Sequence, residues 1–240
     1  MTKRNTGVIV AVAAAAVVAG GALWWFTTGD AEPTTDVTAP PIQSTSTAAG
    51  VEDGGARGSG AEVPTVYEIT SGSTASFTID EVLRGNPTTV VGVSSVVLGQ
   101  VQIDPAELAR SEIGTILVNA RDFTTDSGNR NRAIRGPILD TEVVEFIEFA
   151  PTSIDGLEGP LQAGTVFEFA VTGGLTIRDI TNEVVFDVTA SIDGRGFLVG
   201  RAEASVLRSD FRLTIPNAPG VADVSDEVRL TLEFEAAPTS

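Results

Sequence analysis

The sequence of 240 residues contains no cysteine and no histidine. Without these side chains the chain cannot form a Ser-His-Asp triad, a thiol nucleophile, a histidine- or cysteine-based metal site, a disulfide or a histidine pH switch. Basic residues are also scarce, since 15 lysines and arginines against 32 aspartates and glutamates give a formal net charge of −17. Because such an acidic surface repels phosphate backbones, nucleic acid is not expected as a partner.

Carboxylates are the one abundant reactive group, so a glycosidase-type acid pair or a calcium site stays formally open. No calcium-loop motif of the form D-x-[DN]-x-[DN]-G occurs in the chain. The stretches IDG (154–156) and SIDGRG (191–196) instead have the composition of turns between strands. We therefore expect no enzyme, no metal and no cofactor, and a hydrolase is the weakest of the hypotheses.

An uncharged run lies near the N-terminus, at residues 7–28. As a helix it would span about 30 Å, the thickness of a bilayer core. Lys3 and Arg4 precede it, so the positive-inside rule predicts a cytoplasmic N-terminus and an extracytoplasmic remainder. Residues 1–28 are therefore predicted to be a transmembrane anchor in the cell membrane. The alternative is a signal segment cleaved near the small residues of 29–31, which would make the protein secreted or periplasmic.

The next segment, residues 29–63, is rich in Thr, Ser, Gly, Pro and Ala and has almost no large apolar side chains. Such a composition cannot bury enough surface to fold, so it predicts a flexible linker. Its root-mean-square reach would be roughly 30 Å. One domain is expected to follow over residues 64–236, with a short tail at 237–240.

The domain shows short runs of alternating apolar and polar residues separated by turn residues, which predicts an all-β fold. The candidate strands are residues 65–70, 74–83, 88–94, 96–103, 115–123, 144–154, 165–177, 183–192, 196–208 and 227–236. A helical turn is expected after Asp104 and a short helix or loop from Asp126. Because each strand has one apolar face, the pattern fits either a two-sheet sandwich or a closed barrel.

Residues 173–188, GGLTIRDITNEVVFDV, resemble the hallmark of the YceI-like family, in which a glycine and an L-T-I segment precede a turn, a threonine and a strand. The matching positions are Gly174, Leu175, Thr176, Ile177, Thr181, Val184, Phe186 and Val188. Similar blocks follow the family order at 90–104, 124–139, 145–154 and 206–216, so the resemblance covers about residues 64–236. The chain departs from the family pattern at Ser94, Asn131, Asp179 and Arg212, the last three in predicted turns and loops.

The resemblance implies an eight-stranded antiparallel β-barrel similar to lipocalins. It also implies an exported binding or carrier protein that holds a polyisoprenoid, such as a quinone tail, in an apolar internal channel. An isoprenoid tail offers only apolar surface, worth roughly 25 cal/mol per Å² buried, so it needs neither histidine nor cysteine. The alternative is a non-catalytic extracytoplasmic interaction or spacer module with a filled core; the oligomeric state stays open.

Two sets of candidate ligand-binding residues follow from the resemblance. The apolar cavity candidates are Val101, Ile116, Val118, Ile147, Phe149, Phe167, Phe169, Val184, Phe186, Val188, Leu230, Leu232 and Phe234. The possible head-group contacts are Arg130, Arg132 and Arg135, in a loop that could cap one end of the barrel. On so acidic a protein the alternative for these arginines is pairing with neighbouring carboxylates.

Overall fold

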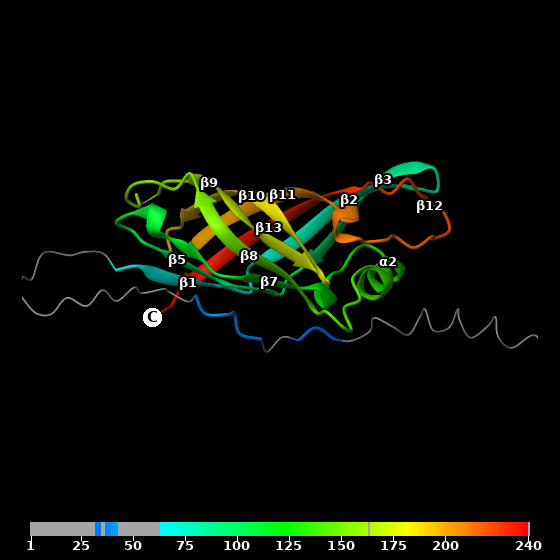
Figure 1. Ribbon diagram of the computed structural model, residues 1–240, viewed down its shortest axis with the longest axis horizontal. Coiled ribbons are helices and arrows are strands. Elements are labelled where there is room, and N and C mark those ends of the chain that lie inside the picture. Colours follow the sequence, from blue (N-terminus) through cyan, green and yellow to red (C-terminus); the bar gives the residue numbers. More distant parts are fainter. Residues whose placement is uncertain (1–31, 35–36, 43–62, 163, 240) are drawn as a thin grey trace, which may run out of the picture.

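A computed structural model of the chain describes residues 32–34, 37–42, 63–162 and 164–239. Most of the domain is a strongly curled antiparallel sheet, elongated and with the C-terminus near β1 (Figure 1). The first strands are β1 (Thr65–Ile69), β2 (Thr74–Leu83), β3 (Asn86–Ser94), β4 (Val97–Leu98), β5 (Gln100–Ile103), β6 (Glu112–Ile113) and β7 (Ile116–Asn119). The later strands are β8 (Phe146–Asp155), β9 (Phe167–Ile177), β10 (Ile180–Ile192), β11 (Leu198–Leu207), β12 (Val221–Ala222) and β13 (Glu227–Pro238). The predicted all-β class is therefore confirmed.

The sheet contains 13 strands where the resemblance implied eight. The difference arises partly because the continuous run predicted at 96–103 is interrupted at Gly99. The predicted strand at 115–123 ends early, at Asn119, where the 3₁₀ helix η2 (Ala120–Asp122) begins. The backbone path is nonetheless continuous, since β4 leads into β5 and β6 leads into β7. The result is a curled sheet consistent with a lipocalin-like fold.

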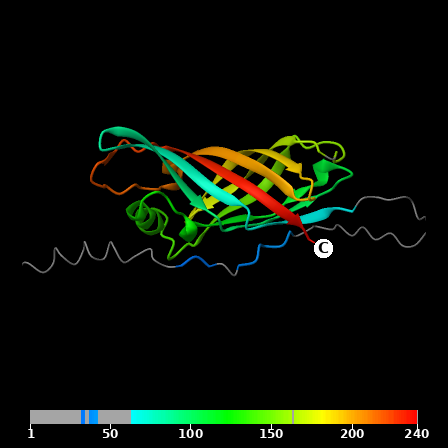
Figure 2. The same cartoon turned by 180° about the vertical axis from the view of Figure 1, so that it is seen from behind.

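The sheet follows the order β4-β7-β8-β9-β10-β11-β13-β1-β5-β6, and β2 joins it through β13 and carries β3 on its other side. Strand β13 runs the length of the sheet and is seen from behind in Figure 2. One edge of β13 pairs with β11 over most of its length, and the other edge pairs first with β2 and then with β1. Because every neighbouring pair is antiparallel, one face of each strand points inward and the other outward.

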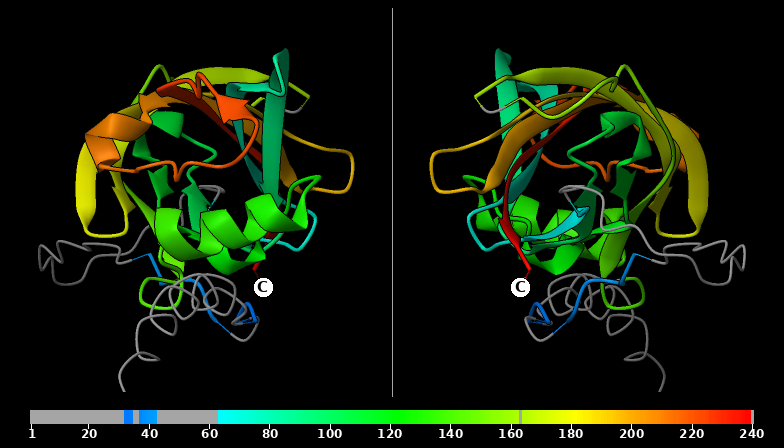
Figure 3. Two further views of the ribbon diagram at one scale, coloured as in Figure 1. Left: turned by 90° about the vertical axis from the view of Figure 1, so that its right-hand side faces the viewer. Right: turned by 90° about the vertical axis from the view of Figure 1, so that its left-hand side faces the viewer.

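Short helices close one end of the curled sheet. The predicted short helix is found as α2 (Gly128–Ala133), continued by one π-helical segment, η3 (Ile134–Ile138), and both lie across that end in Figure 3. The predicted helical turn after Asp104 is η1 (Leu108–Arg110), which lies at the opposite end of the sheet, and η4 (Arg208–Phe211) follows β11. In the part of the chain that the structure describes, no helix is long and apolar enough to span a membrane. The predicted anchor, residues 1–28, lies outside the described residues.

Two groups of buried side chains stabilise the two halves of the domain. One is centred on Tyr67, Leu108 and Leu198, and the other on Phe123, Leu175 and Phe211. The aromatic rings of Phe149 and Phe186 pack against both groups. The interior between the groups is not filled by these side chains, and it is there that the candidate site lies.

Candidate functional site

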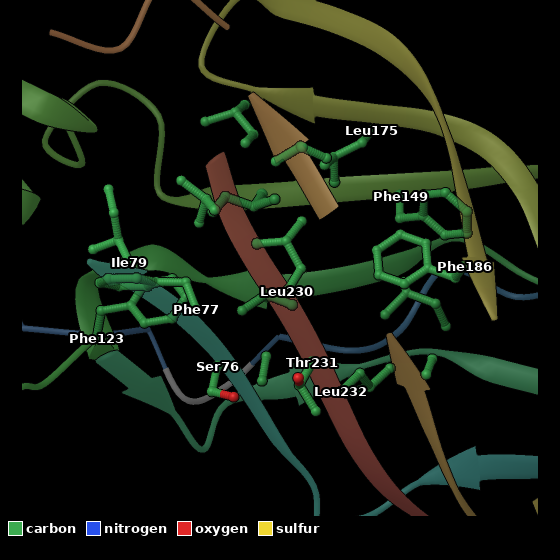
Figure 4. Close-up of a pocket in the computed structure, with 18 of the residues that line it drawn as sticks. Ser76, Phe77, Ile79, Phe123, Phe149, Leu175, Phe186, Leu230, Thr231 and Leu232 are labelled. Carbon is green, nitrogen blue, oxygen red and sulfur yellow. The ribbon is translucent and has the colours of Figure 1, made fainter. Parts of the chain in front are cut away.

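The curled sheet surrounds a cavity of about 640 Å³. This volume falls within the range of roughly 300–1,000 Å³ that is typical of sites for small molecules. Side chains from most of the strands line it, together with side chains from α2, η3 and the loops at both ends. The walls are overwhelmingly aliphatic and aromatic, as Figure 4 shows for the central part.

The strand alternation predicted from sequence places the candidate residues on this wall. Across the sheet, Val188 on β10 lies opposite Ala202 on β11, and Ala202 lies opposite Leu232 on β13. All three point into the cavity because residues paired across adjacent strands share a face. The predicted residues found on the wall are Val101, Ile116, Val118, Ile147, Phe149, Phe167, Phe169, Phe186, Val188, Leu230, Leu232 and Phe234.

Val184 is the one apolar candidate that does not lie on the cavity wall. It lies on β10 in the same alternation as Phe186 and Val188, but it packs in the buried group around Phe211. Other members of this group, among them Leu175, Ile177 and Phe211, do line the cavity, so the cavity continues past this part of β10. Periodicity fixes which face of the sheet a residue occupies, but not whether neighbouring side chains cover it.

Aromatic rings shape the middle of the cavity. Phe149 and Phe186 meet edge to face with ring centroids 4.9 Å apart, and Phe77 and Phe123 meet in the same manner at 5.4 Å. Both pairs are visible in Figure 4. Small residues make room for the rings, since a β-carbon added at Gly92 would lie 2.2 Å from the ring of Phe77. These edge-to-face pairs fix the ring positions, so the cavity wall is preorganised.

Several lining residues were missed from the sequence. Phe77 and Ile79 on β2 follow the same alternation as the other strands and could have been found by it. Other strand residues, among them Ile103, Val171 and Leu175, also line the cavity. A further set belongs to helices and loops, where no strand period applies: Leu108, Phe123, Ile134, Ile138, Leu139, Leu157, Leu161, Leu213, Ile215 and Val224. They close the two ends of the curled sheet.

Charged side chains gather at the end that carries α2. Arg130 lines the cavity there, and its guanidinium pairs with Glu81 at 2.8 Å and with Asp126. Glu81 is only 8% exposed, so this pair is largely desolvated. Arg130 therefore pairs with neighbouring carboxylates, as the alternative interpretation of the three arginines predicted. Arg84, at the β2–β3 turn, also lines the cavity, and its guanidinium has no ion-pair partner among the described residues.

The other two predicted head-group contacts do not lie on the cavity wall. Arg132 donates to the side chain of Asn129 at 3.2 Å, next to it on the surface of α2. Arg135 donates to the backbone oxygen of Phe123 at 3.1 Å, and its buried Nε has no partner among the described residues. Within the described part of the chain, no group of three or more carboxylates is placed to hold a metal ion.

The domain is similar to known proteins in sequence and in fold. The family model of the YceI-like domain matches residues 67–236. A crystal structure of BcnA from Burkholderia cenocepacia is 21% identical, with a TM-score of 0.56, and the match covers 70% of this chain and 99% of that one. A polyisoprenoid binding domain from Saccharophagus degradans, implicated in plant cell wall breakdown, is 12% identical, with a TM-score of 0.56, and the match covers 72% and 98% of the two chains.

The two solved structures share the fold of this domain over nearly their whole length. A comparison with curated proteins gave no match. The family model covers well over half of the sequence, including every strand from β2 to β12. The chain belongs to the YceI-like family.

Proposed function

We propose that the chain binds a long apolar molecule, a polyisoprenoid or a similar lipid, inside the curled sheet, and serves as its carrier or sequestering protein outside the cytoplasm. The single observation that carries this proposal is the cavity of about 640 Å³ inside the curled sheet, with its apolar wall. A structural relative from Saccharophagus degradans is described as a polyisoprenoid binding domain, which supports the same ligand class here.

The physical basis of binding is burial of apolar surface. Each Å² of ligand surface that leaves water contributes roughly 25 cal/mol, and the rigid aromatic pairs around Phe149 and Phe186 need little reordering when the ligand enters. A filled interior, as the interaction or spacer module would require, does not agree with a cavity of about 640 Å³. Binding is therefore the better supported of the two functions.

The ligand is proposed to lie with its polar head at the α2 end. Arg84 and Arg130 line the cavity there, whereas the opposite end is closed by Leu108, Leu157 and Leu161. A head group can keep its polar contacts at the charged end while the tail occupies the apolar interior. The membrane anchor at residues 1–28 is part of the same proposal, because it would place the domain near a source of lipid.

A fluorescence titration tests the binding proposal. We expect geranylgeraniol labelled with nitrobenzoxadiazole to bind the full-length chain saturably, with one molecule per chain and a dissociation constant of micromolar or tighter. Butanol carrying the same fluorophore is the control for binding through the label alone, and it should give no saturable signal. Equal signals from the two probes, or a signal that rises linearly without saturation, would contradict the proposal.

A further inference from the structure

The wall of the curled sheet is split between β6 and β8. Strand β7 pairs with β8 from Asn119↔Phe146 to Ile116↔Phe149, and the ladder stops there. Beyond that point β6 pairs with β5, while the rest of β8 pairs with β9. A register shift between Pro151 and Ser153 further displaces β8. The two strands therefore flank a slit that no described backbone ladder bridges.

The slit lies between the main cavity and a groove on the outer surface. One side of this groove is formed by Pro151, Thr152 and Ser153, and the other side is formed by Glu112 and Gly114. Ser111, Ile113 and Ile154 line both the groove and the main cavity. The wall at this place is thus a single layer of side chains with no backbone ladder across it.

An N-terminal segment lies along the groove and contributes to its lining. This segment, here called the strap, comprises residues 32–34 and 37–42, drawn in blue along the outer side of the sheet in Figures 1 and 3. Ala39 is only 3% exposed, and residues 40–42 form part of the groove lining. The Ile42 amide donates to the Gln100 side chain at 3.3 Å. Part of the segment predicted to be a flexible linker therefore lies against the sheet.

The strap is attached at its other end by a polar cluster. The Thr34 amide and hydroxyl donate to the two carboxylate oxygens of Glu145, at 2.6 and 2.9 Å. The fully buried Asn119 side chain donates to both Thr34 and Glu145, and Arg121 pairs with Glu145 at 2.7 Å. Partial burial opposes ionisation of Glu145, but the hydrogen bonds from Thr34 and Asn119 and the charge of Arg121 outweigh it and lower the pKa of Glu145. The Glu145 carboxylate is therefore ionised at neutral pH, and its hydrogen bonds to the strap are intact.

Lifting the strap would break no strand pairing. Pro40 and Pro41 have no amide hydrogen to donate, so this part of the strap covers the sheet edge without joining it as a strand. Opening the strap therefore breaks the hydrogen bonds at Thr34 and Ile42 but no strand pairing, so it costs less free energy than the opening of a paired strand. By contrast, the α2 end is lined by the charged groups of Glu81, Arg84 and Arg130, which an apolar chain passes less readily.

We propose that the slit between β6 and β8 is a lateral entrance to the cavity for an apolar chain, and that the strap is its cover. The entrance is lined by Ile113 and Ile154, so the apolar ligand passes between apolar side chains. This inference rests on the proposed lipid-binding function of the cavity, and it adds the route by which the ligand enters and leaves.

A disulfide between strap and sheet tests the proposal. A β-carbon added at Gly114 would lie 3.1 Å from Cγ1 of Ile42, which places cysteines at these two positions within the reach of a disulfide. The chain contains no other cysteine, so Ile42→Cys/Gly114→Cys in the full-length protein can form only this bond within the chain. We expect the oxidised form to release labelled geranylgeraniol to phosphatidylcholine vesicles at least 10-fold more slowly than the reduced form, with unchanged affinity. Equal rates in the two redox states would overturn the proposal.

Two controls complete the experiment. The single variants Ile42→Cys and Gly114→Cys, taken through the same oxidation and purified as monomers, should show no redox effect. Glu145→Gln removes the charge of the strap anchor and should accelerate release several-fold; an unchanged or slower rate would count against the strap as a cover.

Thiol labelling in the absence of ligand tests the opening of the slit independently of the lipid-binding function. In an Ile154→Cys variant, the thiol lies beneath the strap, and the added Glu145→Gln change should raise its rate of labelling by a bulky maleimide several-fold. Labelling that does not change would refute opening at the slit. If the labelled lipid binds to no form of the protein while labelling does increase, the lipid-binding function is wrong and the opening of the slit is retained.

Discussion

Ala202→Phe is expected to weaken binding of labelled geranylgeraniol by roughly 50-fold or more. Ala202 lies between Val188 and Leu232 on the cavity wall, so a phenyl ring at this position projects into the space that the ligand would occupy. A ring that excludes on the order of 100 Å² of ligand contact removes roughly 2.5 kcal/mol of apolar burial. The measurement is the same fluorescence titration with the full-length chain.

Val185→Phe is the matched control for Ala202→Phe. Val185 lies on β10 but is 51% exposed on the outer face, so the added ring meets solvent. Its affinity should stay within about 2-fold of the parent chain. The midpoint of thermal unfolding should change little in either variant, because the ring at position 202 enters a void and does not overpack a filled core. Parental affinity of a folded Ala202→Phe protein would mean that the ligand lies elsewhere.

Gly200→Ala is expected to lower the free energy of unfolding by about 3 kcal/mol, at the upper end of the usual cost of overpacking. A β-carbon at this position of β11 would lie 2.3 Å from the backbone oxygen of Thr189 and 2.6 Å from the ring of Phe234. Because the first of these contacts is with backbone, the strands β10 and β11 would have to move apart. Urea unfolding monitored by circular dichroism measures the change.

Gly194→Ala provides the matched control with the same chemical change. Gly194 lies in the turn between β10 and β11, its φ is not in the left-handed region, and an added β-carbon meets no atom within 4 Å. The substitution should therefore stabilise the protein slightly, by about 0.5 kcal/mol, because it restricts the unfolded chain. If the two alanine variants unfolded at the same urea concentration, the close packing of β10 against β11 around Gly200 would be refuted.

The alternation of apolar and polar residues allowed most of the sheet and most of the cavity wall to be predicted. Strands such as β10 and β13 are long and regular, and their inward residues Phe186, Leu230 and Leu232 lie on the cavity wall as expected. The pattern works because consecutive residues of a strand point to opposite faces. It does not distinguish Val184, which packs in the buried group around Phe211, from its neighbours on the cavity wall.

The features that depend on distant contacts could not be predicted in this way. The strap has the composition of a flexible linker, and its attachment requires Thr34 to meet Glu145, which is 111 residues away in the sequence. The charge of Arg130 indicated a head-group contact, but its partner Glu81 lies 49 residues away on β2. A single sequence contains no signal that identifies such pairs.

Mass spectrometry of an organic extract of the purified full-length chain tests the central claim most directly, with the Ala202→Phe variant prepared in parallel as the control for lipid carried along by the preparation. The account predicts a polyisoprenoid or a similar long apolar lipid at close to one molecule per chain in the parent protein, and a strongly reduced amount in the variant. Equal amounts of lipid in the two extracts, or none in the parent even after incubation with long-chain quinones, would contradict it.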